Sequence, residues 1–179
     1  MGARTGAQYV ERLKNSSREV WLRGTRVTDV TTHAAFNAPM GHIARIYDMQ
    51  HEPEFKDVLT YDSPSSGDPV GTSFMMAKNY DDIVKRRRAF RLMSDATFGL
   101  IGRTPDFCNT IAMAWAESPG VFEKLGPRYK ENVLRYYEYV RENDLYLTHA
   151  VIPPQVDRSK SSAEQTDKYI HLGVVRETD

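Results

Sequence analysis

Three helix-length segments in succession, closed by a pair of prolines, constrain the fold of this chain more than any other feature of its sequence. Apolar residues recur at helical spacing in segments that run from about Tyr80 to Leu100, Pro105 to Ala116 and Pro127 to Thr148. The third helix must end before Pro153-Pro154, because proline cannot continue a helix. From Lys168 to Thr178 the pattern alternates and is rich in valine, isoleucine and leucine, which predicts one or two strands. The sequence therefore predicts a mainly α fold, in which a helical domain is followed by the start of a β-domain.

The spacing of apolar residues also predicts which faces of the first and third helices are buried. The predicted buried residues are Ile83, Phe90, Met93, Thr97 and Leu100 in the first helix, and Tyr129, Val133, Tyr136, Val140 and Leu147 in the third. Asn79 can cap the first helix, and Asp81 and Asp82 suit the positive end of its dipole. The basic run Lys85 to Arg88, with Arg91, could meet phosphate or a partner, but a solvated helix face is the favoured interpretation.

The first seventy residues predict smaller elements. Thr5 to Leu13 reads as a short helix that Thr5 caps. Glu19 to Val27 has apolar residues alternating around a glycine, which predicts a hairpin, and Met40 to Gln50 predicts a second helix. Glu52 to Gly71 is turn-rich, with strong loop chemistry from Asp62 to Pro69. So long a polar loop is often functional or mobile, and the alternative is a plain surface excursion.

The end of the chain suggests an unfinished domain. A strand or hairpin without neighbours is not stable. We therefore expect a helical domain with a small hairpin over residues 1–150, and a linker with the first strands of an incomplete β-domain over residues 151–179. The remainder of that β-domain would be missing or supplied by another chain.

Composition excludes several classes of function. The 24 basic residues equal the 24 acidic ones, so nothing favours nucleic acid or an anionic membrane as a partner. No apolar run is long enough to span a bilayer, and the first residues lack the apolar stretch of a signal peptide. Cys108 is the single cysteine, which rules out an internal disulfide and a cysteine-based metal cage. These features lead us to expect a cytoplasmic protein.

Two residues could carry chemistry on their position alone. Arg103 lies in a tight link between two predicted helices and could hold a carboxylate or a phenolate. Alternatively, it caps the preceding helix or pairs with a surface acid. His149 lies where the third helix runs out and is a candidate acid, base or donor. From spacing alone, a satisfied core histidine is the better interpretation.

Other segments leave the chemistry open. Pro153 to Ser159 is extended and could offer backbone amides to a ligand, or it is a rigid interdomain linker. Tyr136 to Tyr139 could line an aromatic pocket or belong to a packed bundle. No dinucleotide-binding, phosphate-binding-loop, zinc-protease or nucleophile-elbow motif is present in the sequence, and no metal is implied.

Taken together and in order, the motifs resemble one family. The sequence is similar to the N-terminal part of the 4-hydroxyphenylacetate 3-hydroxylase family, the oxygenase component of two-component flavin monooxygenases, over essentially its whole length. The matching motifs are Arg4 to Tyr9, Val30 to His33 with Phe36, Ile43 to Asp48, Arg86 to Phe90, Gly102 to Asp106, Tyr136 to Asp144, Thr148 to Ala150 and Pro154 to Ser159.

The resemblance implies a fold and a reaction. The fold is like that of the acyl-CoA dehydrogenases, in which a helical N-terminal domain precedes a β-domain and a C-terminal bundle. FADH2 would come from a separate NAD(P)H-dependent flavin reductase. Oxygen would then form a flavin hydroperoxide that hydroxylates a phenol ortho to its hydroxyl group. Members of the family are commonly homo-oligomers, so a tetramer is expected for the complete protein.

The resemblance also assigns roles to residues. The substrate-binding arginine and histidine of the family fall on Arg103 and His149, which would hold the phenolic oxygen. Stabilising a phenolate raises the electron density at the ortho carbon. Flavin contacts fall on His149 to Ile152 and on Gln155, Val156, Asp157 and Arg158.

One substrate position departs from the family. Phe107 stands where many members carry tyrosine, and a phenyl ring cannot donate a hydrogen bond. The phenol, or its binding mode, would therefore differ from 4-hydroxyphenylacetate. The distant 4-hydroxybutyryl-CoA dehydratase branch needs several cysteines for its iron–sulfur cluster, and Cys108 alone cannot supply them. The competing interpretation is a non-catalytic helical binding or oligomerisation module, or an inactive remnant of the enzyme.

Overall fold

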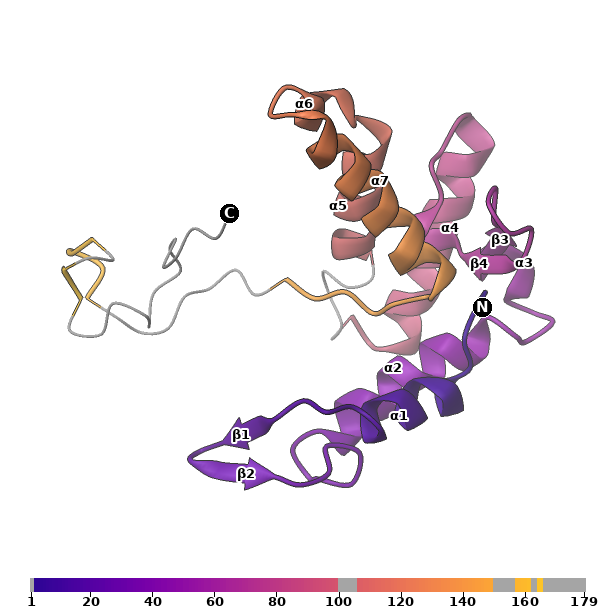
Figure 1. The fold of residues 1–179 in the computed structure, drawn as a ribbon. Coiled ribbons are helices and arrows are strands. Elements are labelled where there is room, and N and C mark those ends of the chain that lie inside the picture. Colours follow the sequence, from indigo (N-terminus) through magenta and orange to yellow (C-terminus); the bar gives the residue numbers. More distant parts are fainter. Residues whose placement is uncertain (1, 100–105, 150–156, 162–163, 166–179) are drawn as a thin grey trace. The chain divides into compact units, whose positions relative to one another are not determined.

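A computed structural model describes residues 2–99, 106–149, 157–161 and 164–165 of the chain. Its contacts divide the chain into two units, Met1–Leu147 and Thr148–Asp179. All helices and strands assigned within the described residues lie in the first unit, which is mainly helical as the sequence predicts (Figure 1). The strands expected between Lys168 and Thr178 lie outside the described residues, so the β-domain and the boundary near residue 150 stay predictions.

The first helix, α1, spans Gly6–Lys14 and lies along α2, which spans Asn37–Met49 (Figure 1). Thr5 caps α1 through a capping box, because its side chain accepts from the backbone of Gln8 while the Gln8 side chain accepts from the backbone of Thr5. The two helices approach closely at Gly6, where a Cβ atom would stand 2.5 Å from the carbonyl oxygen of Ala44. A side chain at this position would push the helices apart.

The predicted hairpin is confirmed. Strand β1, Val20–Leu22, pairs antiparallel with β2, Thr25–Val27. The two residues between the strands, Arg23 and Gly24, have φ angles of 51° and 78°. Positive φ at both central residues is the mark of a type I′ turn, whose twist matches that of the flanking strands.

The turn-rich region holds more structure than the sequence predicts. It contains the short helix α3, Lys56–Leu59, and an antiparallel pair formed by β3, Thr60–Asp62, and β4, Pro69–Gly71. A short 3-10 helix, η1, follows at Thr72–Phe74. Strands of three residues are too short to show the alternation by which a sequence reveals a strand.

Helix α4 spans Tyr80–Ala96 and ends before Leu100, the predicted end. Asn79 caps it as expected, accepting from the backbone of Asp82 at 2.9 Å. The predicted buried stripe is partly wrong, because Ile83 is 57% exposed. The buried residues of α4 are Arg86, Ala89 and Met93.

Within the basic run, Arg87, Arg88 and Arg91 are exposed as predicted, but Arg86 is an exception. Its side chain is only 7% exposed. The guanidinium donates to the carbonyl oxygen of Met75 and, at 2.8 Å, to the hydroxyl of Thr110. These bonds replace the water that a buried guanidinium loses, so Arg86 ties α4 to η1 and α5.

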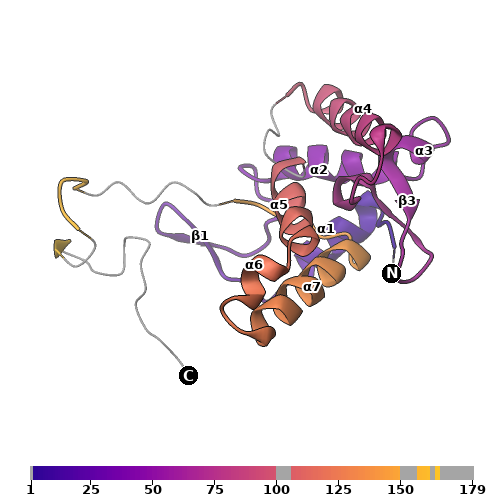
Figure 2. The same ribbon diagram turned by 90° about the horizontal axis from the view of Figure 1, so that it is seen from above.

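Three further helices complete the first unit: α5 at Asp106–Glu117, the short α6 at Gly120–Glu123, and α7 at Pro127–Glu142. Helices α5 and α7 pack side by side with α6 at one end (Figures 1 and 2). Helix α7 ends well before Thr148, and its predicted buried face is confirmed only in part. Val140 is buried and Val133 packs against the core as predicted, but Tyr136 is 45% exposed and its neighbour Tyr137 is buried instead.

Two apolar clusters form the core of this unit. One joins η1, α5 and α7 through Phe74, Ala112, Met113, Ala116, Tyr137 and Val140. The other joins α2, α3 and α4 through Ile46, Met49, Leu59, Ala89 and Met93. Helices α2, α4, α5 and α7 therefore each contribute buried residues to one of these two clusters.

Candidate functional site

The structure describes only part of the predicted site. Arg103, Ile152, Gln155 and Val156 lie outside the described residues. Phe107 lies in the first unit, whereas His149, Asp157 and Arg158 lie in the second. That Arg103 and His149 share one cleft therefore stays a prediction.

Phe107 lies in the first turn of α5, the helix that follows the segment containing Arg103. Its side chain is 37% exposed, while the next two residues, Cys108 and Asn109, are buried. The side-chain amide of Asn109 donates to the hydroxyl of Ser73 at 2.8 Å. This bond holds the start of α5 against η1.

In the second unit, the described part of the predicted flavin segment forms a tight turn. One oxygen of the Asp157 carboxylate accepts from the backbone nitrogen of Ser159 at 3.1 Å and from its hydroxyl at 2.6 Å. The bond from the Ser159 hydroxyl holds the pKa of Asp157 below its ordinary value. The side chain of Gln165 donates to the Asp157 carbonyl at 2.7 Å, which closes the turn.

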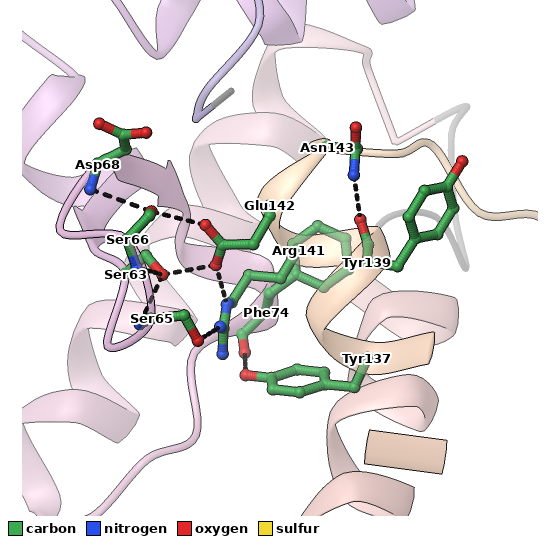
Figure 3. A network of polar contacts seen from close by, with 10 residues as sticks. All are labelled: Ser63, Ser65, Ser66, Asp68, Phe74, Tyr137, Tyr139, Arg141, Glu142 and Asn143. Carbon is green, nitrogen blue, oxygen red and sulfur yellow. Dashed lines mark hydrogen bonds and ion pairs between the residues drawn. The ribbon is translucent and has the colours of Figure 1, made fainter. Parts of the chain in front are cut away.

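The loop between β3 and β4 is attached to the C-terminal end of α7 (Figure 3). We call this attachment the serine anchor and define it as Ser63, Ser65, Ser66, Arg141 and Glu142. Glu142 accepts from the hydroxyls of Ser63 at 2.5 Å and Ser66 at 2.6 Å. Arg141 donates to Ser65 at 2.7 Å and forms an ion pair with Glu142 at 2.7 Å. The loop therefore lies at the surface, with residues 64–69 exposed, but its serines attach it to α7.

The electrostatics of the serine anchor favour an ionised Glu142. Partial burial acts to raise its pKa, but the hydrogen bonds from Ser63, Ser66 and Arg141 outweigh burial and leave the pKa below its ordinary value. The carboxylate form therefore holds the loop against α7 at neutral pH.

A second attachment lies just beyond the helix end and is buried. We call it the arginine anchor and define it as Arg4, Tyr47, Gln50 and Asp144. The Arg4 guanidinium and the Tyr47 hydroxyl both donate to the carbonyl oxygen of Asp144, with distances of 2.9 Å from Arg4 Nε and from Tyr47. Arg4 Nη2 also donates to the Tyr47 hydroxyl at 2.7 Å. The Asp144 carboxylate accepts from the backbone of Arg4 at 3.0 Å and from Gln50 at 2.8 Å.

Burial dominates the electrostatics of the arginine anchor. It raises the pKa of Asp144 above the ordinary value, although the backbone N–H of Arg4 and the amide of Gln50 act to lower it. The chain from Asp144 runs directly to Thr148 and His149. Together the two anchors hold the C-terminal end of α7 against the β3–β4 loop, Arg4 and α2.

Sequence reasoning missed both anchors. Arg4 and Asp144 fall within motifs that carry the family resemblance, but nothing local marks them as partners. They lie 140 residues apart in the chain. Position within a shared motif was the only signal that could have singled them out.

The described part of the chain contains neither a membrane-spanning helix nor a cluster of metal-binding side chains. None of its helices is long and apolar enough to cross a membrane. No group of three or more histidine, cysteine, aspartate or glutamate side chains is placed to hold a metal ion among these same residues.

Comparison with known proteins identifies the family. The sequence model described as 4-hydroxyphenylacetate 3-hydroxylase N terminal matches residues 5–179. The oxygenase component of 4-hydroxyphenylacetate 3-monooxygenase from Thermus thermophilus is 41% identical over 99% of this chain, which spans 36% of that relative. The oxygenase component of 4-nitrophenol 2-monooxygenase from a Rhodococcus species is 38% identical over 98% of this chain and 33% of its own length.

A solved structure agrees with the sequence matches. The crystal structure of the oxygenase component of 4-hydroxyphenylacetate 3-monooxygenase, complexed with FAD and 4-hydroxyphenylacetate, superposes with a TM-score of 0.87 at 41% identity. The superposition covers 99% of this chain and 36% of that one. The chain thus spans about a third of the length of the proteins it matches. It belongs to the 4-hydroxyphenylacetate 3-hydroxylase family and corresponds to the N-terminal region of its members.

Proposed function

We propose that this chain is the N-terminal part of a reduced-flavin-dependent monooxygenase that hydroxylates a phenol ortho to its hydroxyl group. The observation that carries the proposal is the superposition of 99% of the chain, with a TM-score of 0.87, on a structure complexed with FAD and 4-hydroxyphenylacetate. A separate NAD(P)H-dependent reductase would deliver the flavin, and molecular oxygen would be the second substrate. The complete protein would be a homo-oligomer.

In this proposal Arg103 and His149 donate hydrogen bonds to the phenolic oxygen. Both residue types offer N–H groups that stabilise a developing phenolate, which makes the ortho carbon more electron-rich. Phe107 would line the same pocket with an apolar surface. Because it cannot donate a hydrogen bond, it favours a phenol whose para substituent needs no donor at this point.

The residues of the second unit suit FAD by their chemistry. Arg158 lies in the exposed turn that begins at Asp157, and a guanidinium matches the oxygens of a phosphate. His149, Ile152, Gln155 and Val156 would complete the contacts from this chain. When bound, reduced FAD supplies the oxygen-activating chemistry, while the residues of this chain bind and orient the phenol.

A chimaera tests the proposal. Residues 1–179 would replace the matching N-terminal region of the Thermus thermophilus oxygenase component, and turnover of phenols would be measured with a reductase, NADH and FAD. We expect hydroxylation next to the phenolic oxygen, with a large loss of turnover in Arg103→Ala and His149→Ala but little loss of flavin affinity. Arg91→Ala is the matched control, because that exposed arginine, among the residues that the structure describes, pairs with Asp95 of its own helix. Full turnover in both site variants would refute the assigned roles.

The 179-residue chain by itself gives a second test. Because it spans about a third of its relatives, we expect it to bind reduced FAD weakly and not to hydroxylate phenols. Anaerobic titration followed by flavin fluorescence measures this affinity. Tight binding by the chain alone would show that the flavin site is essentially complete within it.

A further inference from the structure

A small cavity lies inside the first unit, between α2, η1, α5 and the end of α7. Its volume is about 30 Å³. Apolar side chains such as Ile46, Leu59 and Met93 form part of its wall. The wall also includes five buried polar side chains, those of Gln50, Thr72, Ser73, Asn109 and Asp144.

Three oxygen atoms of this wall converge beside Gly71. A Cβ atom at Gly71 would stand 3.2 Å from Asp144 Oδ1, 3.2 Å from Gln50 Oε1 and 3.6 Å from Ser73 Oγ. The bond between Gln50 and Asp144 uses their other atoms, Nε2 and Oδ2. Glycine therefore leaves a space bordered by a carboxylate oxygen, an amide oxygen and a hydroxyl.

Asn109 adds an unmet hydrogen-bonding group. Its side chain is 2% exposed, and its Oδ1 atom has no hydrogen-bond partner among the described residues. Exchanging the oxygen and nitrogen of the amide does not solve this, because the Ser73 hydroxyl can serve only one of them. Buried polar groups of this kind are usually satisfied by an internal water.

We propose that the cavity is a binding site for one ordered water molecule. The water would donate to Asn109 Oδ1 and to Gln50 Oε1 or Asp144 Oδ1, and it would accept from the Ser73 hydroxyl. Three such bonds are typical for an internal water, and the volume exceeds the roughly 10–15 Å³ that one water needs. The inference goes beyond the proposed function and does not depend on it.

The position of the site gives the water a structural role. Asn109 lies in the same part of α5 as Phe107, and Asp144 begins the segment that leads to His149. Within the first unit, the water would bridge α5 to the residues that follow α7.

Gly71→Ala and Gly41→Ala form a matched pair of variants. The methyl group of Gly71→Ala would occupy the space beside the three oxygens, whereas nothing lies within 4 Å of a Cβ at Gly41. Long-lived internal waters would be counted by 17O magnetic relaxation dispersion on the 179-residue chain. We expect one fewer in Gly71→Ala than in wild type, together with a lower Tm, and no fewer in Gly41→Ala. Equal counts in wild type and Gly71→Ala would overturn the proposal.

A crystal structure of the wild-type chain provides a test that needs no variant. We expect density for a water within hydrogen-bonding distance of Asn109 Oδ1. Xenon density in the cavity under pressure would show a dry site, and an anomalous peak from rubidium or thallium(I) would show a cation site. Either result would overturn the proposal. If Gly71→Ala fails to fold, this structure still decides the question.

Discussion

The arginine anchor and the serine anchor hold the same end of α7, but they differ in how far they exclude water. Asp144 is 5% exposed, and burial is the main cause that raises its pKa. In the serine anchor, the Glu142 side chain keeps 17% of its surface exposed. Its pKa is lowered, because the hydrogen bonds to its carboxylate outweigh the effect of burial. A buried charge is expensive to leave without partners, whereas one near solvent can find water instead. The arginine anchor should therefore matter more for stability.

Arg4→Met gives the largest expected effect. The variant removes a guanidinium that donates to the Asp144 backbone carbonyl and to the Tyr47 hydroxyl, and whose charge favours the buried Asp144 carboxylate. It should cost roughly 3–5 kcal/mol of unfolding free energy. Urea unfolding of the 179-residue chain, followed by circular dichroism, measures this loss. Arg12→Met on the exposed side of α1 is the control and should stay within about 0.5 kcal/mol of wild type. A similar small loss in Arg4→Met would remove the distinction between the two anchors.

Tyr47→Phe comes next. It deletes one buried hydroxyl that accepts from Arg4 and donates to the Asp144 carbonyl. Because the charges stay in place, we expect a smaller loss of about 2 kcal/mol in the same unfolding measurement. Tyr139→Phe, at a 51% exposed position, should change stability little. Equal losses in the two variants would mean that burial of the hydroxyl is unimportant.

Glu142→Gln tests the serine anchor. The amide keeps one acceptor for the serine hydroxyls but loses the charge, so we expect a loss of about 1 kcal/mol. A double-mutant cycle with Ser66→Ala should show coupling between these two residues, since their side chains are bonded at 2.6 Å. Additive losses would indicate that the bond contributes nothing. A loss as large as that of Arg4→Met would reverse the order of the anchors.

The pH dependence should have opposite signs for the two carboxylates, with the smallest effects of the series. The lowered pKa of Glu142 contributes stability above the unfolded pKa, and this stability is lost as pH falls through the folded value. The raised pKa of Asp144 contributes stability below the unfolded pKa, and this is lost as pH rises through the folded value.

Unfolding of two variants between acid and neutral pH checks these signs. Relative to wild type, the deficit of Glu142→Gln should grow as pH rises. The deficit of Asp144→Asn should shrink over the same range. Parallel trends would contradict the contrast drawn between the anchors.

The sequence by itself determined the local elements and the family. Thr5 and Asn79 cap their helices as expected, and a glycine marks the first hairpin, because caps and turns depend on a few adjacent residues. The candidate site residues were identified from family motifs that occur in order along the chain. Spacing alone left purely structural roles open for Arg103 and His149. Their roles stay predictions, because Arg103 lies outside the described residues and His149 lies in the other unit.

Only the tertiary structure decided which groups are buried together. Arg86 lies inside although its neighbours in the sequence are charged, and Tyr136 is exposed where Tyr137 is buried. The pairing of Arg4 with Asp144 joins positions 140 residues apart. Helical periodicity fixes the shape of a face, but packing against distant segments selects its rotation. The same packing places Arg4 beside Asp144 and forms the internal cavity, and no local sequence pattern encodes either feature.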